Sequence, residues 1–392
     1  MTTTINASTT LGLQQTADTS GVLALQTANT TALTLDASQN ATFAGYVNAP
    51  NTFGFKNRLL NGGMVIDQRN AGASVTQGTS YTYVMDRFAI RGTVTSKFTG
   101  QRSTTAPAGF VNSLLCTSSS AYSVGAAEAF FAGQIIEGLN CADLGWGTTN
   151  AATVTLSFWV RSSLTGTFGG SLCNYAGDRS YPFTYTISAA NTWEQKSVTI
   201  AGDQSGTWPT DNGGGIVLNI GLGAGSTLSG TAGAWAGALY RSATGATSVV
   251  GTSGATFYIT GVQLEKGSTA TSFDYRPYGT ELALCQRYYS KMSASSGGPY
   301  AAFASGFSGA SNAASLYFKY PVQMRAAPTL TLSNCAIQSA SGAINAATAS
   351  TFYPGSDSGY LIVLTTGQTL GYGSALVANN NASAYLDLSS EL

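Results

Sequence analysis

Three tryptophans in loop-like surroundings are the residues of this sequence best suited to bind a ligand. Trp146, Trp208 and Trp235 are flanked by small or polar residues rather than by long apolar runs. The C–H groups of a sugar ring stack on an aromatic face while its hydroxyl groups bond to polar side chains. These positions therefore predict a glycan site, with the alternative that each indole plugs the end of a folded core.

A second aromatic group lies in residues 292–392, among Ser, Gly and Asn. It comprises Tyr300, Phe303, Phe307, Tyr317, Phe318, Tyr320, Phe352, Tyr353, Tyr360, Tyr372 and Tyr385. Tyrosine in such surroundings provides large, rigid contacts with adaptable polar neighbours, as in recognition surfaces. We predict Tyr300 and Tyr353 as glycan-binding residues, while an intertwined trimer core could use the same aromatic residues.

The sequence offers little for catalysis. It contains no histidine, which removes His-based triads and His-ligated zinc. Glycosidases need two carboxylates about 5 to 10 Å apart, but no local spacing singles out a pair. The candidates by residue type are Glu128, Glu137, Asp143, Asp178, Glu194, Asp203 and Asp211. We therefore predict that the protein is not an enzyme.

No cofactor is predicted, although one region could bind a metal. Asp203, Asp211 and Asn212 offer hard oxygen ligands, so a structural calcium ion is an alternative to simple turn formation. The five cysteines are scattered singly, without a CxxC pair, and are expected to be free buried thiols.

The charge composition excludes two classes of partner. Lys plus Arg and Asp plus Glu both number 17, so no basic field exists to hold nucleic acid. No apolar run is long enough to span a bilayer, and residues 1–6 lack the features of a signal peptide. Charged residues make up only 9% of the chain, which suits a protein packed in an oligomer or larger assembly. We expect the protein to be made and assembled in a cytoplasm.

Residues 1–56 are expected to form a β-repeat stem. Leu23 and Leu25 are echoed by Leu33 and Leu35 in an approximate ten-residue repeat with the alternation of short strands. A pair of leucines per strand cannot bury a core in one chain, so the segment is predicted to wind with copies of itself. Residues 41–50 should form the last strand, ending at Pro50.

Two further regions follow the stem. Residues 57–277 contain eight or so apolar or alternating runs bounded by turn residues, which predicts a jelly-roll β-sandwich. The runs are 81–91, 109–117, 129–136, 154–161, 183–187, 194–200, 215–222 and 257–264. Trp159, inside the apolar run LSFWVR, is expected in its core. Residues 278–392 should form a small β-rich tip domain, with a short helix over 279–291 at its start. The predicted class is all-β.

Two stretches about two hundred residues apart carry a family resemblance. Residues 57–70 read NRLLNGGMVIDQRN and close at Asp86-Arg87-Phe88; residues 261–267 read GVQLEKG and run on to YGTELALCQRYY at 278–289. They resemble the opening and closing motifs of a sandwich module in tail fibres of tailed bacteriophages. The phrase YPVQMRAAPT at 320–329 is similar to an element of the small terminal domains of such fibres.

Charged residues concentrate in these motifs. They are Arg58, Asp67, Arg69, Asp86 and Arg87 in the first, and Glu265, Lys266, Asp274, Arg276, Glu281 and Arg287 near the second. They could orient a ligand, but paired charges that fix the ends of a domain are the favoured interpretation.

The resemblance implies a virion structural protein: a tail fibre or tail-tip protein that binds a host surface glycan and mediates adsorption. The resemblance also implies a homotrimer with a slender stem, in which residues 1–56 would attach the protein to other virion proteins. Avidity in the trimer would strengthen weak contacts. A head fibre or capsid decoration protein is the first alternative. A polysaccharide depolymerase is the second, opposed by the absence of histidine and of a long β-helical repeat.

Overall fold

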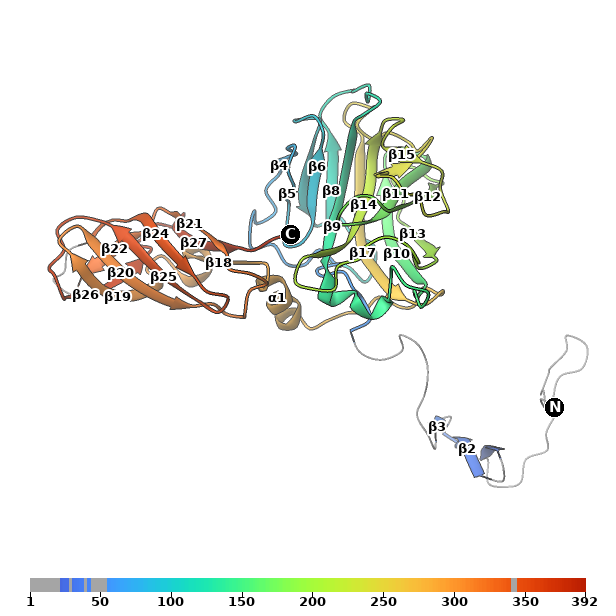
Figure 1. Cartoon of the computed structure of the whole chain (residues 1–392), viewed down its shortest axis with the longest axis horizontal. Coiled ribbons are helices and arrows are strands. Elements are labelled where there is room, and N and C mark those ends of the chain that lie inside the picture. Colours follow the sequence, from blue (N-terminus) through green and yellow to red (C-terminus); the bar gives the residue numbers. More distant parts are fainter. Residues whose placement is uncertain (1–21, 28–29, 39–40, 44–54, 340–343) are drawn as a thin grey trace, which may run out of the picture. The chain divides into compact units, whose positions relative to one another are not determined.

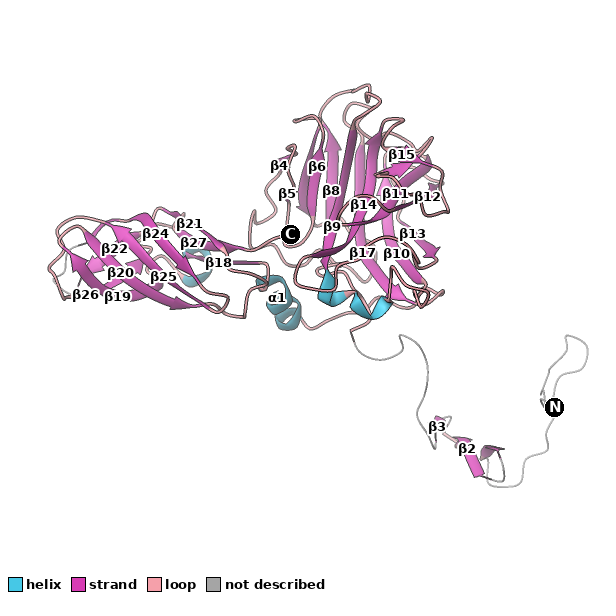
Figure 2. Ribbon diagram, viewed as in Figure 1, coloured by secondary structure: helices cyan, strands magenta, loops and turns pink. Residues whose placement is uncertain are grey.

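The computed structural model describes residues 22–27, 30–38, 41–43, 55–339 and 344–392. The chain divides into two compact units, Met1–Thr52 and Phe53–Leu392. Strands make up nearly all of the regular structure, with only short helices (Figure 2). The predicted all-β class is therefore confirmed. In the part of the chain that the structure describes, no helix is long and apolar enough to cross a membrane.

The described part of the first unit is a three-stranded antiparallel sheet. Its strands are β1 (Leu23–Thr27), β2 (Thr30–Leu35) and β3 (Ala41–Phe43), in that order. Leu23 lies opposite Leu35 and Leu25 opposite Leu33, so the four leucines share one face. Leu23 and Leu25 are each 42% exposed. The short leucine strands are thus present; the rest of the strand predicted over 41–50 lies outside the described residues.

Residues 55–277 form a β-sandwich of two six-stranded antiparallel sheets (Figure 1). The first sheet consists of β13 (Glu194–Ile200), β10 (Val154–Ser162), β17 (Thr256–Lys266), β8 (Ser113–Ser118), β7 (Phe98–Ser103) and β4 (Val75–Thr76). The second consists of β12 (Ser180–Ile187), β11 (Gly166–Asn174), β14 (Gly214–Ala224), β9 (Ala129–Glu137), β6 (Ala89–Gly92) and β5 (Thr82–Tyr83). The chain alternates between the sheets from β8 to β11 and again from β12 to β17, as in a jelly roll.

Short elements complete the sandwich. They are the 3-10 helices η1 (Gly138–Asn140) and η2 (Ala142–Leu144) and the parallel pair β15 (Ser229–Gly230) and β16 (Ser242–Ala243). Alternate side chains of each strand fill the core, so Phe158 and Val160 of β10 are buried there. Trp159 belongs to the opposite face and is only partly buried, which corrects its predicted core position.

The outer face of the second sheet is covered by the chain itself. Both faces of β9 and β14 are buried, although only one faces the sandwich core. The loop containing β16 lies over this sheet, and a Cβ on Gly169 or Gly221 would lie 2.6 Å from Ser242 Oγ. These two glycines therefore allow the loop to approach closely, and the sheet face is closed to a large ligand.

The two motif stretches pack directly against each other. Asn57 Nδ2 donates to the Val262 carbonyl at 2.9 Å, and Asn57 Oδ1 accepts from Leu264 N at 3.0 Å. Val262 N also donates to the Gly62 carbonyl at 3.0 Å. A Cβ on Gly62 would lie 2.1 Å from Val262 O, so the approach requires glycine. The first and last parts of the sandwich are thereby joined.

The charges near these motifs form ion pairs. Arg58 pairs with Asp143, Arg102 with Asp67, Arg276 with Glu281 and Arg287 with Glu137, at N···O distances of 2.8, 3.6, 3.3 and 2.6 Å. Most of these pairs join segments that are distant in the sequence. Their arrangement agrees with the structural role favoured for the charges rather than with ligand orientation.

Residues 278–392 contain a second hydrophobic core between two sheets. The first sheet consists of β18 (Tyr289–Ser293), β27 (Tyr385–Ser389) and β21 (Thr329–Ser333). The second consists of β23 (Ile344–Ala346), β22 (Ala336–Ser339), β26 (Gly373–Val377), β19 (Ala302–Ala310), β20 (Ala313–Lys319), β25 (Ser358–Leu364) and β24 (Thr348–Pro354). Leu316 and Leu361 from the larger sheet and Leu386 and Leu388 from the smaller one are fully buried.

The helix predicted over 279–291 is shorter than expected. Helix α1 (Tyr278–Gln286) ends before Arg287, and residues 289–293 form strand β18 instead. Tyr289 pairs with Ser389 in the antiparallel ladder to β27, so sheet pairing overrides the helical pattern there. A second short helix, α2 (Ala294–Gly297), follows.

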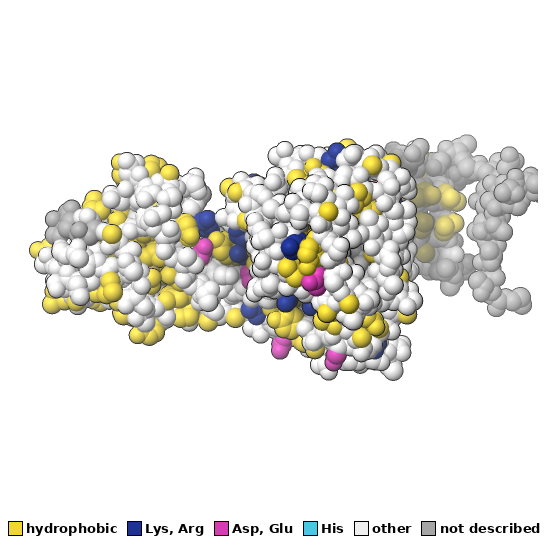
Figure 3. Space-filling model, turned by 90° about the horizontal axis from the view of Figure 1, so that it is seen from above, with side chains coloured by type: hydrophobic (Ala, Val, Ile, Leu, Met, Phe, Trp, Pro, Cys, Tyr) yellow, Lys and Arg dark blue, Asp and Glu magenta, His cyan; other side chains and the backbone are white. Residues whose placement is uncertain are grey.

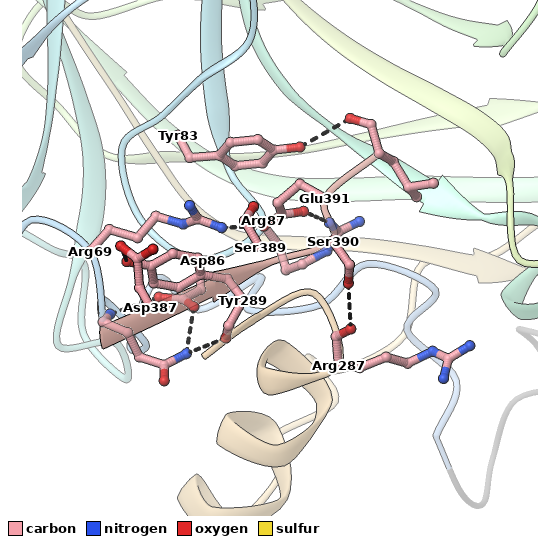
Figure 4. Close-up of polar contacts among 12 residues, drawn as sticks. Arg69, Tyr83, Asp86, Arg87, Arg287, Tyr289, Asp387, Ser389, Ser390 and Glu391 are labelled. Atoms are coloured by element: carbon pink, nitrogen blue, oxygen red, sulfur yellow. Dashed lines mark hydrogen bonds and ion pairs between the residues drawn. The ribbon is translucent and has the colours of Figure 1, made fainter. Parts of the chain in front are cut away.

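The last residues of the chain bind the sandwich through a cluster that we call the C-terminal lock, formed by Arg69, Tyr83, Arg87 and Glu391 (Figure 4). Glu391 accepts from Arg69 Nη2 at 2.6 Å and also pairs with Arg87, which is 1% exposed. Tyr83 OH donates to the Leu392 carbonyl at 3.2 Å. Burial alone would lower the pKa of Arg87, but the Glu391 carboxylate holds it above its ordinary value.

Arg325, within the YPVQMRAAPT phrase, strengthens the same junction. Its Nε donates to the Ser390 carbonyl at 2.7 Å, and its Nη1 donates to the Asn212 carbonyl at 2.8 Å. Asn212 Nδ2 returns a bond to the Arg325 carbonyl at 2.9 Å. This phrase therefore holds the chain end against a sandwich loop.

Candidate functional site

The three predicted tryptophans come together at the sandwich core, in which Trp146 and Trp208 are buried and against which Trp235 packs, partly buried. The ring centroids of Trp146, Trp208 and Trp235 lie 4.7, 5.4 and 5.5 Å apart in nearly perpendicular pairs. Their indole N–H groups all donate to backbone carbonyls, those of Ala152, Ser205 and Ala201. Trp146 and Trp208 are only 7% and 9% exposed. This geometry favours the packing alternative, because buried faces cannot stack on a sugar.

The aspartates considered for calcium have other partners. Asp203 receives a bidentate pair from Arg179, with both bonds at 2.7 Å. Asp211 Oδ1 accepts from Gly213 N at 2.8 Å, which is the turn role stated as the alternative. Within the described ranges, no group of three or more His, Cys, Asp or Glu side chains is placed to hold a metal ion.

The carboxylates considered for hydrolysis are engaged in the fold. Glu137 bonds to Arg287 and Tyr288, Glu194 to Lys196, Asp143 to Arg58, Asp178 to Asn174, and Glu128 to Tyr122 and Gly125 N. The five cysteines are free and buried. Burial raises the pKa of the Cys116 thiol to about 12, which makes it a poor nucleophile near neutral pH.

A different aromatic group stands out on the larger sheet of residues 278–392. Tyr317 of β20 lies opposite Tyr360 of β25, which lies opposite Tyr353 of β24. We call these three residues the tyrosine row. Side chains alternate between faces along each strand, so Leu316 and Leu361 enter the core while the row lies on the outer face. Three adjacent strands therefore present tyrosines side by side.

The rings of the tyrosine row form an exposed offset stack. The centroids of Tyr317 and Tyr360 are 4.9 Å apart with planes at 16°, and those of Tyr360 and Tyr353 are 5.3 Å apart at 12°. At these separations parallel rings overlap only in part, so some of each face stays uncovered. Tyr317 and Tyr353 are 52% and 55% exposed. Tyr360 OH and Ser315 Oγ are 3.1 Å apart, which orients the central ring.

An open groove of about 660 Å³ runs beside the row, with Ser305, Ser358 and Gly355 among its lining residues. Its charge is balanced, because Lys319 Nζ pairs with Asp357 at 2.9 Å. The bond from Lys319 lowers the pKa of the Asp357 carboxyl, so the pair stays ionised near neutral pH. Figure 3 shows mainly uncharged and hydrophobic side chains on the visible face of this domain, at the left.

Only one of the predicted tyrosines belongs to this surface. Tyr353 lies at the edge of the row, whereas Tyr300, 71% exposed, does not line the groove. Tyr317 and Tyr360 were noted for their type but were not predicted as site residues. Their alignment depends on strand pairing. The pairing that places Tyr317 beside Tyr360 has no signal in the sequence near Tyr317.

No family model matches the chain, and no curated protein matches it either. Solved structures similar to it include the enzymatically active domain of tailspike protein 4 of bacteriophage CBA120, with 11% identity and a TM-score of 0.29. This match covers 54% of the chain and 21% of the tailspike domain, so the chain spans about a fifth of that length.

Two other similar structures are those of a carbohydrate-binding module and of an arabinofuranosidase. The family 11 carbohydrate-binding module of a Clostridium thermocellum cellulosomal cellulase is 9% identical, with a TM-score of 0.27, over 51% of this chain and 99% of the module. The arabinose-bound α-L-arabinofuranosidase MgGH51 is 10% identical, with a TM-score of 0.28, over 56% of this chain and 31% of the enzyme. Likenesses this weak do not show function, which has to follow from the geometry of the chain itself.

Proposed function

We propose that this protein is a tail fibre or tail-tip protein of a tailed bacteriophage, and that it binds a host surface glycan through the tyrosine row. The observation that carries the binding proposal is the alignment of three tyrosines on one sheet face, of which Tyr317 and Tyr353 are more than half exposed and Tyr360 is partly buried between them. Exposure of aromatic rings to water is unfavourable and does not stabilise the folded domain. An exposed row of this kind therefore indicates a surface that a ligand or a partner covers. The uncovered parts of Tyr317 and Tyr353 match the apolar face of a sugar.

The surroundings of the row favour a sugar over an apolar peptide or a charged ligand. Phenol hydroxyls accompany each ring, and Ser305 and Ser358 add further donors and acceptors in the groove. Lys319 and Asp357 neutralise each other. A ligand with alternating C–H faces and hydroxyl groups would satisfy both kinds of surface, because an unpaired polar group at a contact is costly.

The assignment to a virion fibre rests on the motif resemblance, and the stem supports it physically. The leucines of β1 and β2 form one apolar face, on which Leu23 and Leu25 are each 42% exposed. Three short strands cannot bury such a face alone. We infer that copies of the same chain cover it in a homotrimer, which native mass spectrometry of the full chain would test.

The glycan proposal is tested by removing the row. Full-length protein and the variant Tyr317→Ala/Tyr353→Ala/Tyr360→Ala would be applied to a printed array of bacterial surface polysaccharides and to host cells. The matched control is Tyr278→Ala, which removes a tyrosine that is 64% exposed at the start of α1, outside this sheet. We expect binding to be lost in the triple variant and kept in the control. Equal binding by both variants would refute the site.

A further inference from the structure

The tyrosine row is one half of a longer row that crosses most of the sheet. Strand pairing aligns one outward residue from each of six neighbouring strands: Gln338, Ala375, Ser305, Tyr317, Tyr360 and Tyr353. Cross-strand partners of this kind share a face. The order is therefore three large aromatic side chains, two small ones and a terminal amide.

The change in side-chain size creates a step in the surface. Tyr317 stands next to Ser305 on β19 and Ala375 on β26, whose side chains are far shorter. One side of the Tyr317 ring therefore faces a lower part of the surface, two strands wide, which we call the low strip and which is formed by Ser305 and Ala375. Gln338 on β22 closes the strip, and its side chain is exposed. Phe307, two residues from Ser305 on the same strand and 45% exposed, borders the strip along β19.

The spacing along this row matches a polymer. Neighbouring strands lie about 4.7–4.9 Å apart, and the tyrosine centroids repeat at 4.9 and 5.3 Å. One pyranose unit of an extended glycan advances by a similar length. A chain lying along the row would thus place successive rings at successive strands, without any movement of the sheet.

The charges near the row exclude an acidic or basic chain as the best ligand. None of the six aligned residues is charged, and the lysine that lines the groove is already paired with Asp357. Lys319 and Asp357 carry opposite charges side by side, so the groove offers an acidic sugar no net positive field and also places a carboxylate beside the lysine. A neutral sugar meets only hydroxyl groups, the Gln338 amide and aromatic rings.

We propose that the glycan is linear and uncharged and that it lies across the strands, roughly at right angles to them. This inference rests on the proposed function of the same surface. Successive sugar rings stack on the uncovered parts of the tyrosine row, and the chain continues over the low strip above Ser305 and Ala375. There its hydroxyl groups reach the Gln338 amide, which can both donate and accept.

The experiment measures how affinity depends on chain length. Calorimetric titrations would use full-length protein with oligomers of one, three and five units, prepared from the linear neutral chain that binds best on the array, and an acidic linear polysaccharide for comparison. We expect affinity to rise from one to three units and again to five, and the acidic chain to bind more weakly. Equal affinity for one and five units, or preference for the acidic chain, would overturn the inference.

A variant that fills the low strip separates this inference from the proposed function. Ser305→Leu should weaken binding of the five-unit oligomer by about tenfold or more and binding of the three-unit oligomer by much less. Ser188→Leu, at an exposed position of the sandwich, is the matched control. Far-UV circular dichroism would check that both variants fold.

The outcomes are distinct. If loss of the tyrosine row abolishes binding but Ser305→Leu leaves the five-unit affinity intact, the chain does not cross the strip and this inference fails, while the proposed function stands. If the triple tyrosine variant binds every glycan as before, both fail. If that variant instead changes the oligomeric mass, the face is an interface between copies, and both proposals are overturned.

Discussion

Replacing Glu391 with glutamine should loosen the junction between the sandwich and residues 278–392. The substitution keeps the shape of the side chain but removes the charge that pairs with Arg69 and Arg87. Arg87 is 1% exposed and stacks over the Tyr288 ring at 3.6 Å, so water cannot take the place of the lost carboxylate. The variant would leave a buried guanidinium without its counter-charge.

The magnitude follows from that burial. Removing one partner of a buried ion pair typically costs about 3–5 kcal/mol, because the remaining charge stays desolvated. The glutamine oxygen can still accept one hydrogen bond, and Arg87 keeps its bond to the Ile135 carbonyl. We therefore expect a loss near the lower limit, about 3 kcal/mol, in the free energy of unfolding. In the double variant Arg87→Met/Glu391→Gln the loss should be smaller than the sum of the two single losses.

Urea unfolding followed by two signals would measure this effect. The five tryptophans all lie between residues 146 and 235, so their fluorescence reports on the sandwich alone. Far-UV circular dichroism reports on every strand. If the C-terminal lock couples the two cores, the two signals should coincide in the wild type and separate in Glu391→Gln.

The control breaks an ion pair that should contribute almost nothing to the free energy of unfolding. In Lys319–Asp357 both side chains are largely exposed, at 74% and 62%, so Asp357→Asn should leave the urea midpoint unchanged. The reasoning is refuted if Glu391→Gln unfolds at the wild-type midpoint, or if the effects of Arg87→Met and Glu391→Gln simply add. Additivity would mean that the two side chains do not interact energetically.

Two further predictions concern the first motif. Gly62→Ala should cost several kcal/mol or prevent folding, since its Cβ would meet Val262 O at 2.1 Å. Gly63→Ala should be tolerated in thermal unfolding, because its Cβ would meet the Phe273 and Phe110 rings at ordinary contact distances of 3.7 and 3.9 Å. Burial raises the pKa of Asp86 from 3.8 to about 6, so the folded state binds this proton more tightly than the unfolded state. The stability that it contributes is lost as pH rises from about 4 to about 6, by up to about 3 kcal/mol relative to Asp86→Asn in urea titrations at each pH.

Much of the sandwich could be predicted because its strands have strong local patterns. The predicted strand over 194–200 has the observed bounds of β13, and the runs over 129–136 and 154–161 fall within a residue of β9 and β10. Strand β11 was missed because Gly166, Gly169 and Gly170 dilute its alternation. Tertiary contacts require glycine at these positions, because a Cβ on Gly169 or Gly170 would lie within 2.6 Å of an atom of another residue. Local propensity cannot anticipate such a requirement.

The tryptophans show the limit of arguing from loop surroundings. Trp146, Trp208 and Trp235 do stand among small and polar residues, as a surface site would require. In the fold, however, their loops bring them within 4.7 to 5.5 Å of one another, and each ring becomes the partner that removes its neighbour from water. Burial of an aromatic ring depends on what the rest of the chain places beside it, which flanking residues do not encode.

The tyrosine row shows why half of the candidate site could have been derived and half could not. Tyr353 and Tyr360 flank the turn at 355–357, where Gly355 N donates to the Ser358 carbonyl at 2.8 Å, so a hairpin reading of that segment would have paired them. Tyr317 reaches Tyr360 across more than forty residues of chain, through the β20–β25 pairing. No sequence pattern near either tyrosine fixes that register. It is set because Leu316 and Leu361, which are adjacent to Tyr317 and Tyr360 in the two strands and point inward, must share one core. The outer face of this sheet is thus specified by the residues on its inside. Core substitutions that shift the register should therefore disrupt the tyrosine row and, with it, the proposed glycan binding.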